Sequence, residues 1–168
     1  FYSTARNRID AFLFPSVEGE GASDHFQTNA AHATITSGGW TGTGPGGGTV
    51  KFGLPEAHTD YIYSVIGEEF GLIACLIIVA LFCFITLRGF AKLLREDDLF
   101  ILLAAAGLLT QFGLQAVINI GVNLNLLPTK GMTLPFISYG GSSMLALALA
   151  MGMVLALTRR RPNLGGLP

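Results

Sequence analysis

The chain has 168 residues, of which 51% are hydrophobic and 12% charged, and its formal net charge is −1. This composition is typical of an integral membrane protein and not of a soluble domain. Because the charges nearly balance, the sequence gives no electrostatic reason to expect a nucleic-acid partner. The two cysteines, Cys75 and Cys83, are eight residues apart in one apolar segment. They would lie about two turns apart on a helix, too far for a disulfide, and are expected to be packing or lipid-facing residues.

Residues 1–60 are expected to form an extracytoplasmic loop region with short interfacial helices. The stretch 16–50 is rich in Gly, Ser and Thr and is predicted to be loop. Gly42, Gly44 and Gly47 match the GxGxxG pattern, but no apolar strand precedes them, so a dinucleotide site is not indicated. A tightly turning or mobile loop is favoured; the alternative is a loop whose backbone N–H groups approach a phosphate of a lipid-linked substrate.

The next segment carries ionisable groups at the entrance of an apolar stretch. Glu56, Asp60, Ser64 and Glu68 recur every four residues, so on one helix they would form a single polar stripe, with His58 beside it. Carboxylates at a membrane boundary usually face a bundle interior or a wet cavity. A carboxylate placed there can accept a proton from a reacting hydroxyl group.

Three apolar segments are long enough to cross the hydrocarbon core of a bilayer, which is about 30 Å thick. They cover residues 65–87, 99–121 and 139–157, within a transmembrane portion 61–161. A basic cluster follows the first segment and another follows the third, namely Arg88, Lys92 and Arg95, and Arg159, Arg160 and Arg161. The positive-inside rule therefore predicts that both clusters and the tail 162–168 are cytoplasmic, while residues 1–60 and 122–138 are outside.

Polar groups recur inside the second segment. Gln111, Gln115, Asn119 and Asn123 are spaced by four and share one face of a helix. One interpretation is hydrogen bonding between helices, and the other is the polar wall of a substrate cavity.

The connection between the second and third segments cannot be a continuous helix, because it contains Pro128 and Pro135. Irregular backbone at this depth must be buried in protein or line a cavity. Lys130 is either an interfacial anchor or a partner for a carboxylate or phosphate. The chain starts at Phe1 without an initiating Met, and three helices alone would lack partners for so many polar groups. We therefore expect a C-terminal fragment that is inactive by itself.

Four stretches of this sequence resemble the signatures of the SEDS family (shape, elongation, division and sporulation): Leu54–Asp60, Gly67–Gly71, Leu127–Gly131 and Leu134–Ser143. Within that family the sequence is most similar to the cell-division member of the alphaproteobacterial branch, and the elongation member is the second candidate. The resemblance implies an all-α integral membrane protein. The chain would supply three transmembrane helices of a bundle of roughly ten, plus a large Gly-rich extracytoplasmic loop.

The resemblance also implies an activity. Members of this family are peptidoglycan glycosyltransferases that polymerise lipid II, the undecaprenyl-pyrophosphate-linked disaccharide peptide. They act at the outer face of the bacterial inner membrane, here at the division septum, with a class B penicillin-binding protein and other division-complex membrane proteins. The family's catalytic aspartate falls on Asp60. A glutamine of the outer loop maps to Gln27, preceded by Phe26 where Tyr is commoner, while Asn29 replaces a second glutamine often found soon after.

Asp60 is thus the expected general base, and several residues are candidates to bind substrate. These are Lys51, Glu56, His58, Lys130, Gln27, Gln115, Asn119, Ser138 and Ser142. No Cys/His spacing typical of a metal site is present, although a divalent cation such as Mg or Mn is compatible with the expected chemistry. Two other classes of function remain open: a lipid II transporter, and a structural hub of the division machinery.

Overall fold

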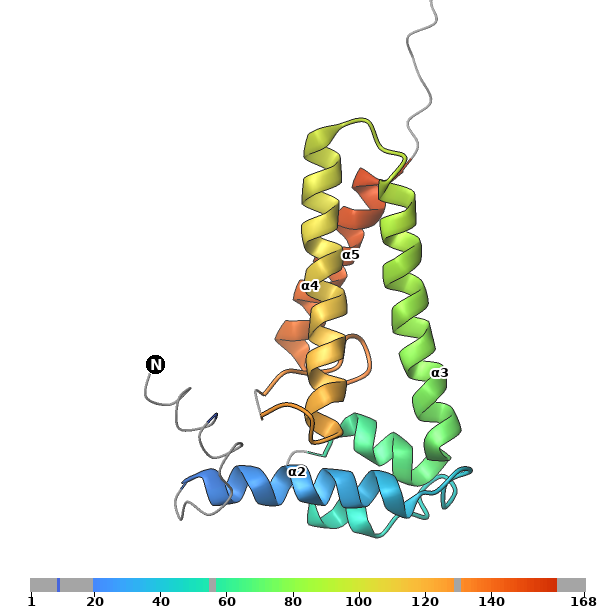
Figure 1. Ribbon diagram of the computed structural model, residues 1–168, viewed down its shortest axis with the longest axis vertical. Coiled ribbons are helices and arrows are strands. Elements are labelled where there is room, and N and C mark those ends of the chain that lie inside the picture. Colours follow the sequence, from blue (N-terminus) through green and yellow to red (C-terminus); the bar gives the residue numbers. More distant parts are fainter. Residues whose placement is uncertain (1–8, 10–19, 55–56, 129–130, 160–168) are drawn as a thin grey trace, which may run out of the picture.

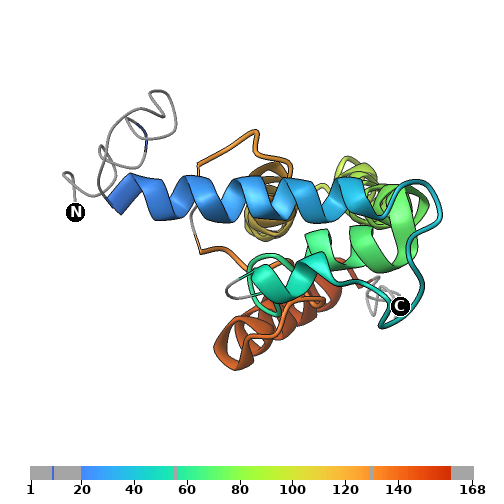
Figure 2. The same ribbon diagram turned by 90° about the horizontal axis from the view of Figure 1, so that it is seen from below.

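The computed structural model of the chain describes residue 9 and residues 20–54, 57–128 and 131–159. This part consists of helices and loops without a strand: α2 (Glu20–Ser37), the 3₁₀ helix η1 (Val50–Gly53), α3 (Ile62–Leu93), α4 (Leu99–Asn123) and α5 (Gly141–Leu157). In Figure 1, α3, α4 and α5 run alongside one another, and α2 lies across one end of them. Seen from below, α2 crosses beneath the ends of α3 and α4, while α5 lies to one side (Figure 2).

The three expected apolar segments are helical. The most apolar windows of α3 and α4 have mean hydropathies of 3.0 and 1.9, and both helices are long and apolar enough to cross a membrane. The third helix, α5, is apolar but has only 17 residues. Only 17% and 22% of the windows in α3 and α4 are buried within the chain, so most of their apolar side chains face outward. Such surfaces suit contact with lipid or with other apolar helices.

Helix α3 is bent at Gly71, where the backbone has φ 78° and ψ −177°. Side-chain-bearing residues rarely adopt this conformation, and a Cβ at this position would lie 2.4 Å from the carbonyl oxygen of Trp40. The bend divides α3 into a short arm, residues 62–70, and a long arm, residues 72–93. The short arm lies across the end of the bundle near α2 before the chain turns along the bundle (Figure 1).

The glycine-rich loop pairs the backbone groups that the bend releases. Thr43 and Gly44 donate their N–H groups to the carbonyls of Glu68 and Glu69, at 2.9 and 3.0 Å. Beyond the bend, the N–H of Leu72 is donated to the carbonyl of Gly39 at 2.9 Å. Because a buried backbone group left unpaired costs free energy, these hydrogen bonds from the loop offset the cost of the bend. The loop therefore turns tightly around α3, and the N–H groups of Thr43 and Gly44 are occupied by the protein itself.

The prediction that residues 16–50 form a loop is wrong for α2. This helix has 18 residues and a polar composition. Hydroxyl groups in its second half bond to carbonyls of the same helix, as Thr34 Oγ1 does to the carbonyl of Ala30 at 2.7 Å, so the buried Thr34 has a hydrogen-bond partner. Ala31 and Thr34 are fully buried. The helix ends at a close approach to the short arm, where a Cβ on Gly38 would lie 2.0 Å from the carbonyl oxygen of Gly67. Tertiary packing therefore determines this helix more than an apolar stripe does.

Three apolar clusters hold the described elements together, one of which contains Leu93, Ala105, Leu109 and Val154 of α3, α4 and α5. The other two lie closer to Asp60. The first lies among α3, α4 and α5 and contains Tyr63, Cys75, Phe82, Phe112, Ala116, Leu134 and Leu147. The second joins α2 to the segment before α3 and to the end of α4, and contains Ala31, Leu54, Ala57, Tyr61 and Val122. Both cysteines are free thiols. The second cluster fixes the segment that carries Asp60 against the end of the bundle.

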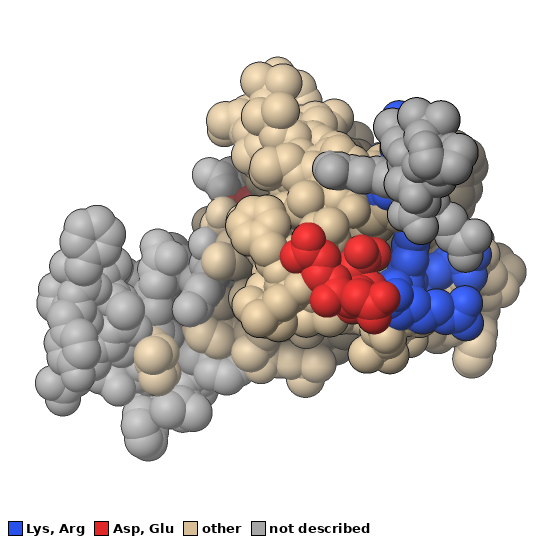
Figure 3. All heavy atoms as spheres, turned by 90° about the horizontal axis from the view of Figure 1, so that it is seen from above, with Lys and Arg blue, Asp and Glu red and all other residues tan. Residues whose placement is uncertain are grey.

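Charged side chains gather at the end of the molecule away from α2 (Figure 3). The last turns of α3 and the connection to α4 carry Arg88, Lys92 and Arg95, all exposed, followed by Asp97 and Asp98. Asp98 begins α4, since its Oδ1 accepts the N–H of Phe100 at 2.9 Å. The basic cluster and Asp60 therefore lie at opposite ends of the helices.

Candidate active site

Asp60 lies two residues before the start of α3 and is partly exposed. The predicted polar stripe is wrong in this respect, because the chain forms turns and not a helix at Asp60. Ser64 and Glu68 do lie on the short arm, and Glu56 lies outside the described residues. Asp60 therefore belongs to a turn whose position depends on its hydrogen-bond partners and not on a helical repeat.

Two amides of α4 bind the main chain of Asp60. The Nδ2 atoms of Asn119 and Asn123 donate to the carbonyl oxygen of Asp60 at 2.9 and 3.0 Å. The Oδ1 atom of Asn123 accepts hydrogen bonds from Ser64, at 2.7 Å from Oγ and 3.2 Å from the backbone N. Ser64, Asn119 and Asn123 are all buried. The end of α4 thus holds Asp60 and the first turn of α3 through one buried polar network.

The same row of amides holds the connection to α5. Asn119 Nδ2 also donates to the carbonyl of Met132, and Gln115 Nε2 donates to the carbonyl of Thr133 at 3.0 Å. This segment passes directly beside the aspartate, since a Cβ on Gly131 would lie 3.5 Å from Asp60 Oδ2. The N–H of Tyr139 is donated to the carbonyl of His58 at 3.0 Å. The two loops, 57–60 and 131–139, are therefore fastened to each other and to α4.

A groove of about 630 Å³ opens between α4 and α5 beside these loops. Its polar lining includes Thr59, Gln115, Thr133, Ser142 and Ser143. An adjoining cavity of about 180 Å³ shares Gln115 and Ser143 with it and is lined mainly by apolar side chains, among them Leu108, Phe112, Leu147 and Met151. The larger groove also has an apolar lining, from Leu114, Ile118 and Met132, and its residues Thr59 and Gly131 lie next to Asp60.

The two interpretations of the amide row therefore apply to different members. Asn119 and Asn123 are buried and bind backbone groups, so they act in packing. Gln111 is exposed and lines the groove, and Gln115 both lines the groove and binds the backbone. The two asparagines of this row are therefore buried in the protein, while the two glutamines face the groove.

The remaining candidate residues are spread over the molecule. Ser142 lines the groove, whereas Ser138 is buried and its Oγ accepts the N–H of Leu134 at 2.8 Å. His58 is exposed, and Gln27 is partly buried on α2. Glu56 and Lys130 lie outside the described residues. The structure thus places Gln115 and Ser142 in the lining of the groove, and Asp60 and Asn119 against the loop 131–139 that borders it.

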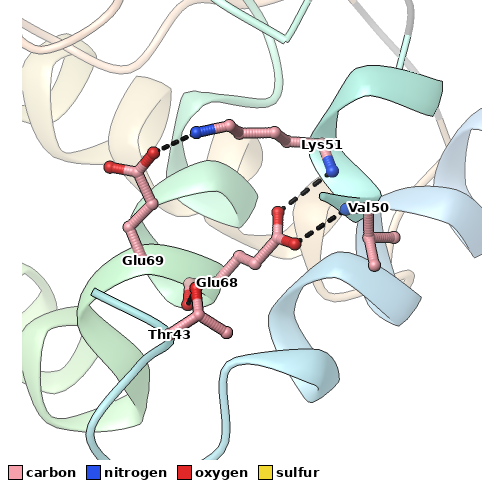
Figure 4. Close-up of polar contacts among 5 residues, drawn as sticks. All are labelled: Thr43, Val50, Lys51, Glu68 and Glu69. Atoms are coloured by element: carbon pink, nitrogen blue, oxygen red, sulfur yellow. Dashed lines mark hydrogen bonds and ion pairs between the residues drawn. The ribbon is translucent and has the colours of Figure 1, made fainter. Parts of the chain in front are cut away.

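Lys51 lies in a separate polar cluster, shown in Figure 4. Its ammonium group pairs with Glu69, and its side chain comes from η1. The carboxylate of Glu68 is 1% exposed and accepts the N–H groups of Val50 and Lys51 at 2.8 and 3.0 Å. The sequence places Glu68 on the predicted polar stripe but does not indicate its partners, because no spacing rule relates η1 to a position of α3 about eighteen residues later. Gly48 packs so closely against Glu68 that a Cβ at position 48 would lie 2.6 Å from the Glu68 carboxyl carbon. The sequence alone does not indicate this contact.

The described residues include no group of three or more His, Cys, Asp or Glu side chains that could hold a metal ion. The described surroundings of Asp60 contribute amides, hydroxyls and backbone groups. The chemistry that these groups can support is proton transfer at the carboxylate of Asp60, with nearby amide and hydroxyl groups available to bind a polar ligand.

Comparison with known proteins gives a consistent result. The family model for the cell cycle proteins FtsW, RodA and SpoVE matches residues 2–163. The probable peptidoglycan glycosyltransferase FtsW of Caulobacter vibrioides is 53% identical over 159 residues, which are 95% of this chain and 40% of that protein. The protein of the same description from Geobacter metallireducens is 45% identical over 156 residues, with coverages of 92% and 41%.

A solved structure also matches. It is a chain of a structure described under the words "Structural coordination of polymerization and crosslinking by a peptidoglycan synthase complex". The two chains superpose with a TM-score of 0.73 and are 31% identical in sequence. The match covers 94% of this chain and 42% of that chain. The present chain thus spans about 40% of the length of the relatives that it matches. Since the family model extends over almost all of its residues, the chain belongs to the FtsW/RodA/SpoVE family of cell cycle proteins, the SEDS family that its motifs resemble.

Proposed function

We propose that this chain is part of a peptidoglycan glycosyltransferase that polymerises lipid II into glycan strands during septal cell-wall synthesis. The observation that carries this proposal is that the Asp60 carboxylate lies against Gly131, which lines a groove offering both polar and apolar groups. A substrate with a sugar head and an isoprenoid tail needs contacts of both kinds. The FtsW relatives, described as probable peptidoglycan glycosyltransferases, support the same assignment.

In the proposed reaction, the 4-hydroxyl of the acceptor sugar attacks the anomeric carbon of a lipid-pyrophosphate-linked donor. Asp60 accepts the hydroxyl proton as the new C–O bond forms. The bond from the anomeric carbon to the pyrophosphate oxygen breaks, and the pyrophosphate leaves as an anion. Because this leaving group needs little protonation, one carboxylate suffices where a glycosidase uses two. An α-linked donor gives a β-linked product by inversion.

The groups that bind the substrate follow from the groove. Gln115 and Ser142 line the groove and are the candidates to contact the sugars, and His58 and Glu56 remain candidates from their places near Asp60 in the chain. Ser138 is a weaker candidate because it is buried and already bonded to Leu134. Lys130 is the candidate to balance the charge of the pyrophosphate. Lys51 is a weaker candidate for that role because its ammonium group already pairs with Glu69. A divalent cation bound with the substrate would serve the same purpose.

The proposed location is the bacterial inner membrane at the division septum. We take α3, α4 and α5 as three spans, with Asp60 at the outer face and the exposed basic cluster of Arg88, Lys92 and Arg95 at the cytoplasmic face. A class B penicillin-binding protein is the proposed partner, which is supported by the similarity to a chain of a peptidoglycan synthase complex. Co-purification with the division or with the elongation partner would distinguish the septal role from a role in elongation.

The decisive experiment assays the full-length protein, together with its partner, for glycan polymerisation from lipid II. Asp60→Asn is expected to lower the rate by about 10²–10⁴-fold, which is the usual contribution of a general base. Asp97→Asn is the matched control, since Asp97 is exposed at the opposite end of the helices. Equal polymer formation by wild type and Asp60→Asn would overturn the proposed function.

A transport function for lipid II is the second candidate, and Gln111 and Gln115 of the amide row favour it because they line the groove and a translocation path needs polar groups within the membrane. The test supplies lipid II already in the outer leaflet of liposomes. Polymer formed under these conditions excludes a purely transporting role, whereas lipid movement without polymer would replace the enzyme assignment.

A further inference from the structure

We propose that Asn123, assisted by Asn119, is a positioning residue that holds the carboxylate of Asp60 in its reactive place without touching substrate. This inference rests on the proposed role of Asp60 as the general base. It concerns the main chain of Asp60, to which both amides are bound.

The two amides converge on one atom. The carbonyl oxygen of Asp60 accepts from Asn119 at 2.9 Å and from Asn123 at 3.0 Å. A carbonyl oxygen has two lone pairs, so both are used. This arrangement fixes the orientation of the peptide group that follows Asp60, and with it the direction of the Cα–Cβ bond that carries the carboxylate.

The amide of Asn123 is itself held in one orientation. Its oxygen accepts from the hydroxyl and the backbone N–H of Ser64, so its nitrogen must face Asp60. The nitrogen also donates to the backbone carbonyl of Asn119 at 2.9 Å. Asn123 is fully buried and Asn119 is 2% exposed, so water does not compete for these bonds. One side chain thereby connects the end of α4, the aspartate and the first turn of α3.

Asn119 also holds the loop that passes beside the carboxylate. Asn119 donates to the carbonyl of Met132, next to Gly131, where a Cβ would lie 3.5 Å from Asp60 Oδ2. Both loops that flank the carboxylate are therefore bound to a common support on α4. A general base must lie within hydrogen-bond reach of the proton that it removes, and a displacement of about 1 Å can cost about 100-fold in rate.

The test measures kcat and KM for lipid II polymerisation by the full-length protein with its partner. The variants are Asn123→Asp and Asn123→Ala, with Ser64→Ala as the matched control. Asp at position 123 still accepts from Ser64 but cannot donate to the carbonyl of Asp60. Ser64→Ala removes a hydrogen bond from the same network and leaves the bonds to Asp60 in place.

We expect both Asn123 variants to lower kcat by about 10- to 100-fold, while KM stays within about threefold. For Ser64→Ala we expect kcat within about threefold of wild type, even if its melting temperature falls as far as that of the Asn123 variants. Equal kcat losses in Ser64→Ala and Asn123→Asp, or an unchanged kcat in folded Asn123→Asp, would overturn the inference. If neither Asn123 variant folds, Asn119→Ala, which removes one of the two donors to Asp60, must show the same selective loss of kcat or the inference is wrong.

The failure of this inference differs from the failure of the proposed function. Loss of polymer in Asp60→Asn together with normal kcat in Asn123→Asp rejects the positioning role alone. Normal polymer formation in Asp60→Asn rejects the general base itself and, with it, the basis for the positioning role.

Discussion

Glu68 accepts the backbone N–H of Val50 at 2.8 Å, so a buried carboxylate of α3 is hydrogen-bonded to the start of a 3₁₀ helix. The backbone N–H of Lys51 supplies a second bond to the same carboxylate. This connection fastens η1 to the short arm of α3 (Figure 4). Since η1 lies just before the segment that leads to Asp60, the connection stabilises one end of that segment, and the amides of α4 hold the other end.

Replacing Glu68 by Gln tests this connection. The substitution keeps the shape but turns one acceptor into a donor that faces a backbone N–H. We expect a loss of about 1–3 kcal/mol in the free energy of unfolding, the usual cost of an unsatisfied buried group. Thermal unfolding of the full-length protein measures the loss, and proteolysis within the loop 38–49 should become faster. Glu69→Gln is the control. Its ion pair with Lys51 has access to solvent, so we expect a loss of at most about 1 kcal/mol in the free energy of unfolding. Equal stability of Glu68→Gln and wild type would contradict the assigned contact.

Exchanging the charges of Lys51 and Glu69 distinguishes a structural lysine from one that binds substrate. Lys51→Glu alone places two carboxylates together and should lower both stability and polymerisation. The double variant Lys51→Glu/Glu69→Lys restores an ion pair, and we expect it to recover most of the activity of wild type. Rates of polymerisation and melting temperatures of the three variants provide the comparison. Recovered stability without recovered activity would instead indicate that the ammonium group at position 51 contacts the pyrophosphate.

Gly71→Ala should disrupt the bend of α3. The alanine would have to adopt a positive φ, and its Cβ would lie 2.4 Å from the carbonyl oxygen of Trp40, so neither the bend nor the loop could be kept. We expect poor folding or a loss of more than about 3 kcal/mol in stability, measured by the yield of monodisperse protein and by thermal unfolding. Gly107→Ala is the matched control in α4. Nothing in the described structure lies within 4 Å of a Cβ there, and a gain of up to about 1 kcal/mol in helix propensity is expected. Similar behaviour of the two variants would contradict the bend.

Two serines that the sequence suggests as substrate-binding residues should behave differently. Ser138→Ala removes the acceptor for the N–H of Leu134 and should cost about 1 kcal/mol in stability, with little change in KM. Ser142→Phe places a large side chain at an exposed position of the groove lining and should raise KM at normal stability. Steady-state kinetics with lipid II and thermal unfolding provide both quantities. A raised KM for Ser138→Ala would restore the hydroxyl of Ser138 as a substrate contact.

Much of the helical architecture could be predicted from the sequence, because length and hydropathy alone indicate the apolar segments that became α3, α4 and α5. The helix α2 could not, since its residues carry no apolar stripe and its burial depends on contacts with the short arm. The bend at Gly71 was also missed. Glycine is common in apolar helices, and only the contacts with Trp40 and the loop show that this one is not helical.

The candidate site was predicted unevenly, for a related reason. The spacing of Gln115, Asn119 and Asn123 correctly indicated one polar face. It did not indicate the partners, because these are backbone carbonyls in two loops distant along the chain. Asp60 was singled out by its motif and by its place at the start of an apolar segment. The predicted polar stripe does not include Asp60, because the turn before α3 interrupts the helical repeat.

The bend at Gly71 and the loop that covers it form one cooperative unit. The carbonyls of Glu68 and Glu69 and the N–H of Leu72 have their partners in residues 39–44, which form further backbone bonds within the loop, such as that from the N–H of Gly42 to the carbonyl of Gly38. Opening either part separates these partners, and each backbone group that stays buried without one costs free energy. Local unfolding of this surface loop would be an all-or-none event that straightens α3 and removes the first turn of that helix from Asn123. Amide hydrogen exchange should accordingly proceed together in the loop and at the bend, although they are separated by more than twenty residues in the chain.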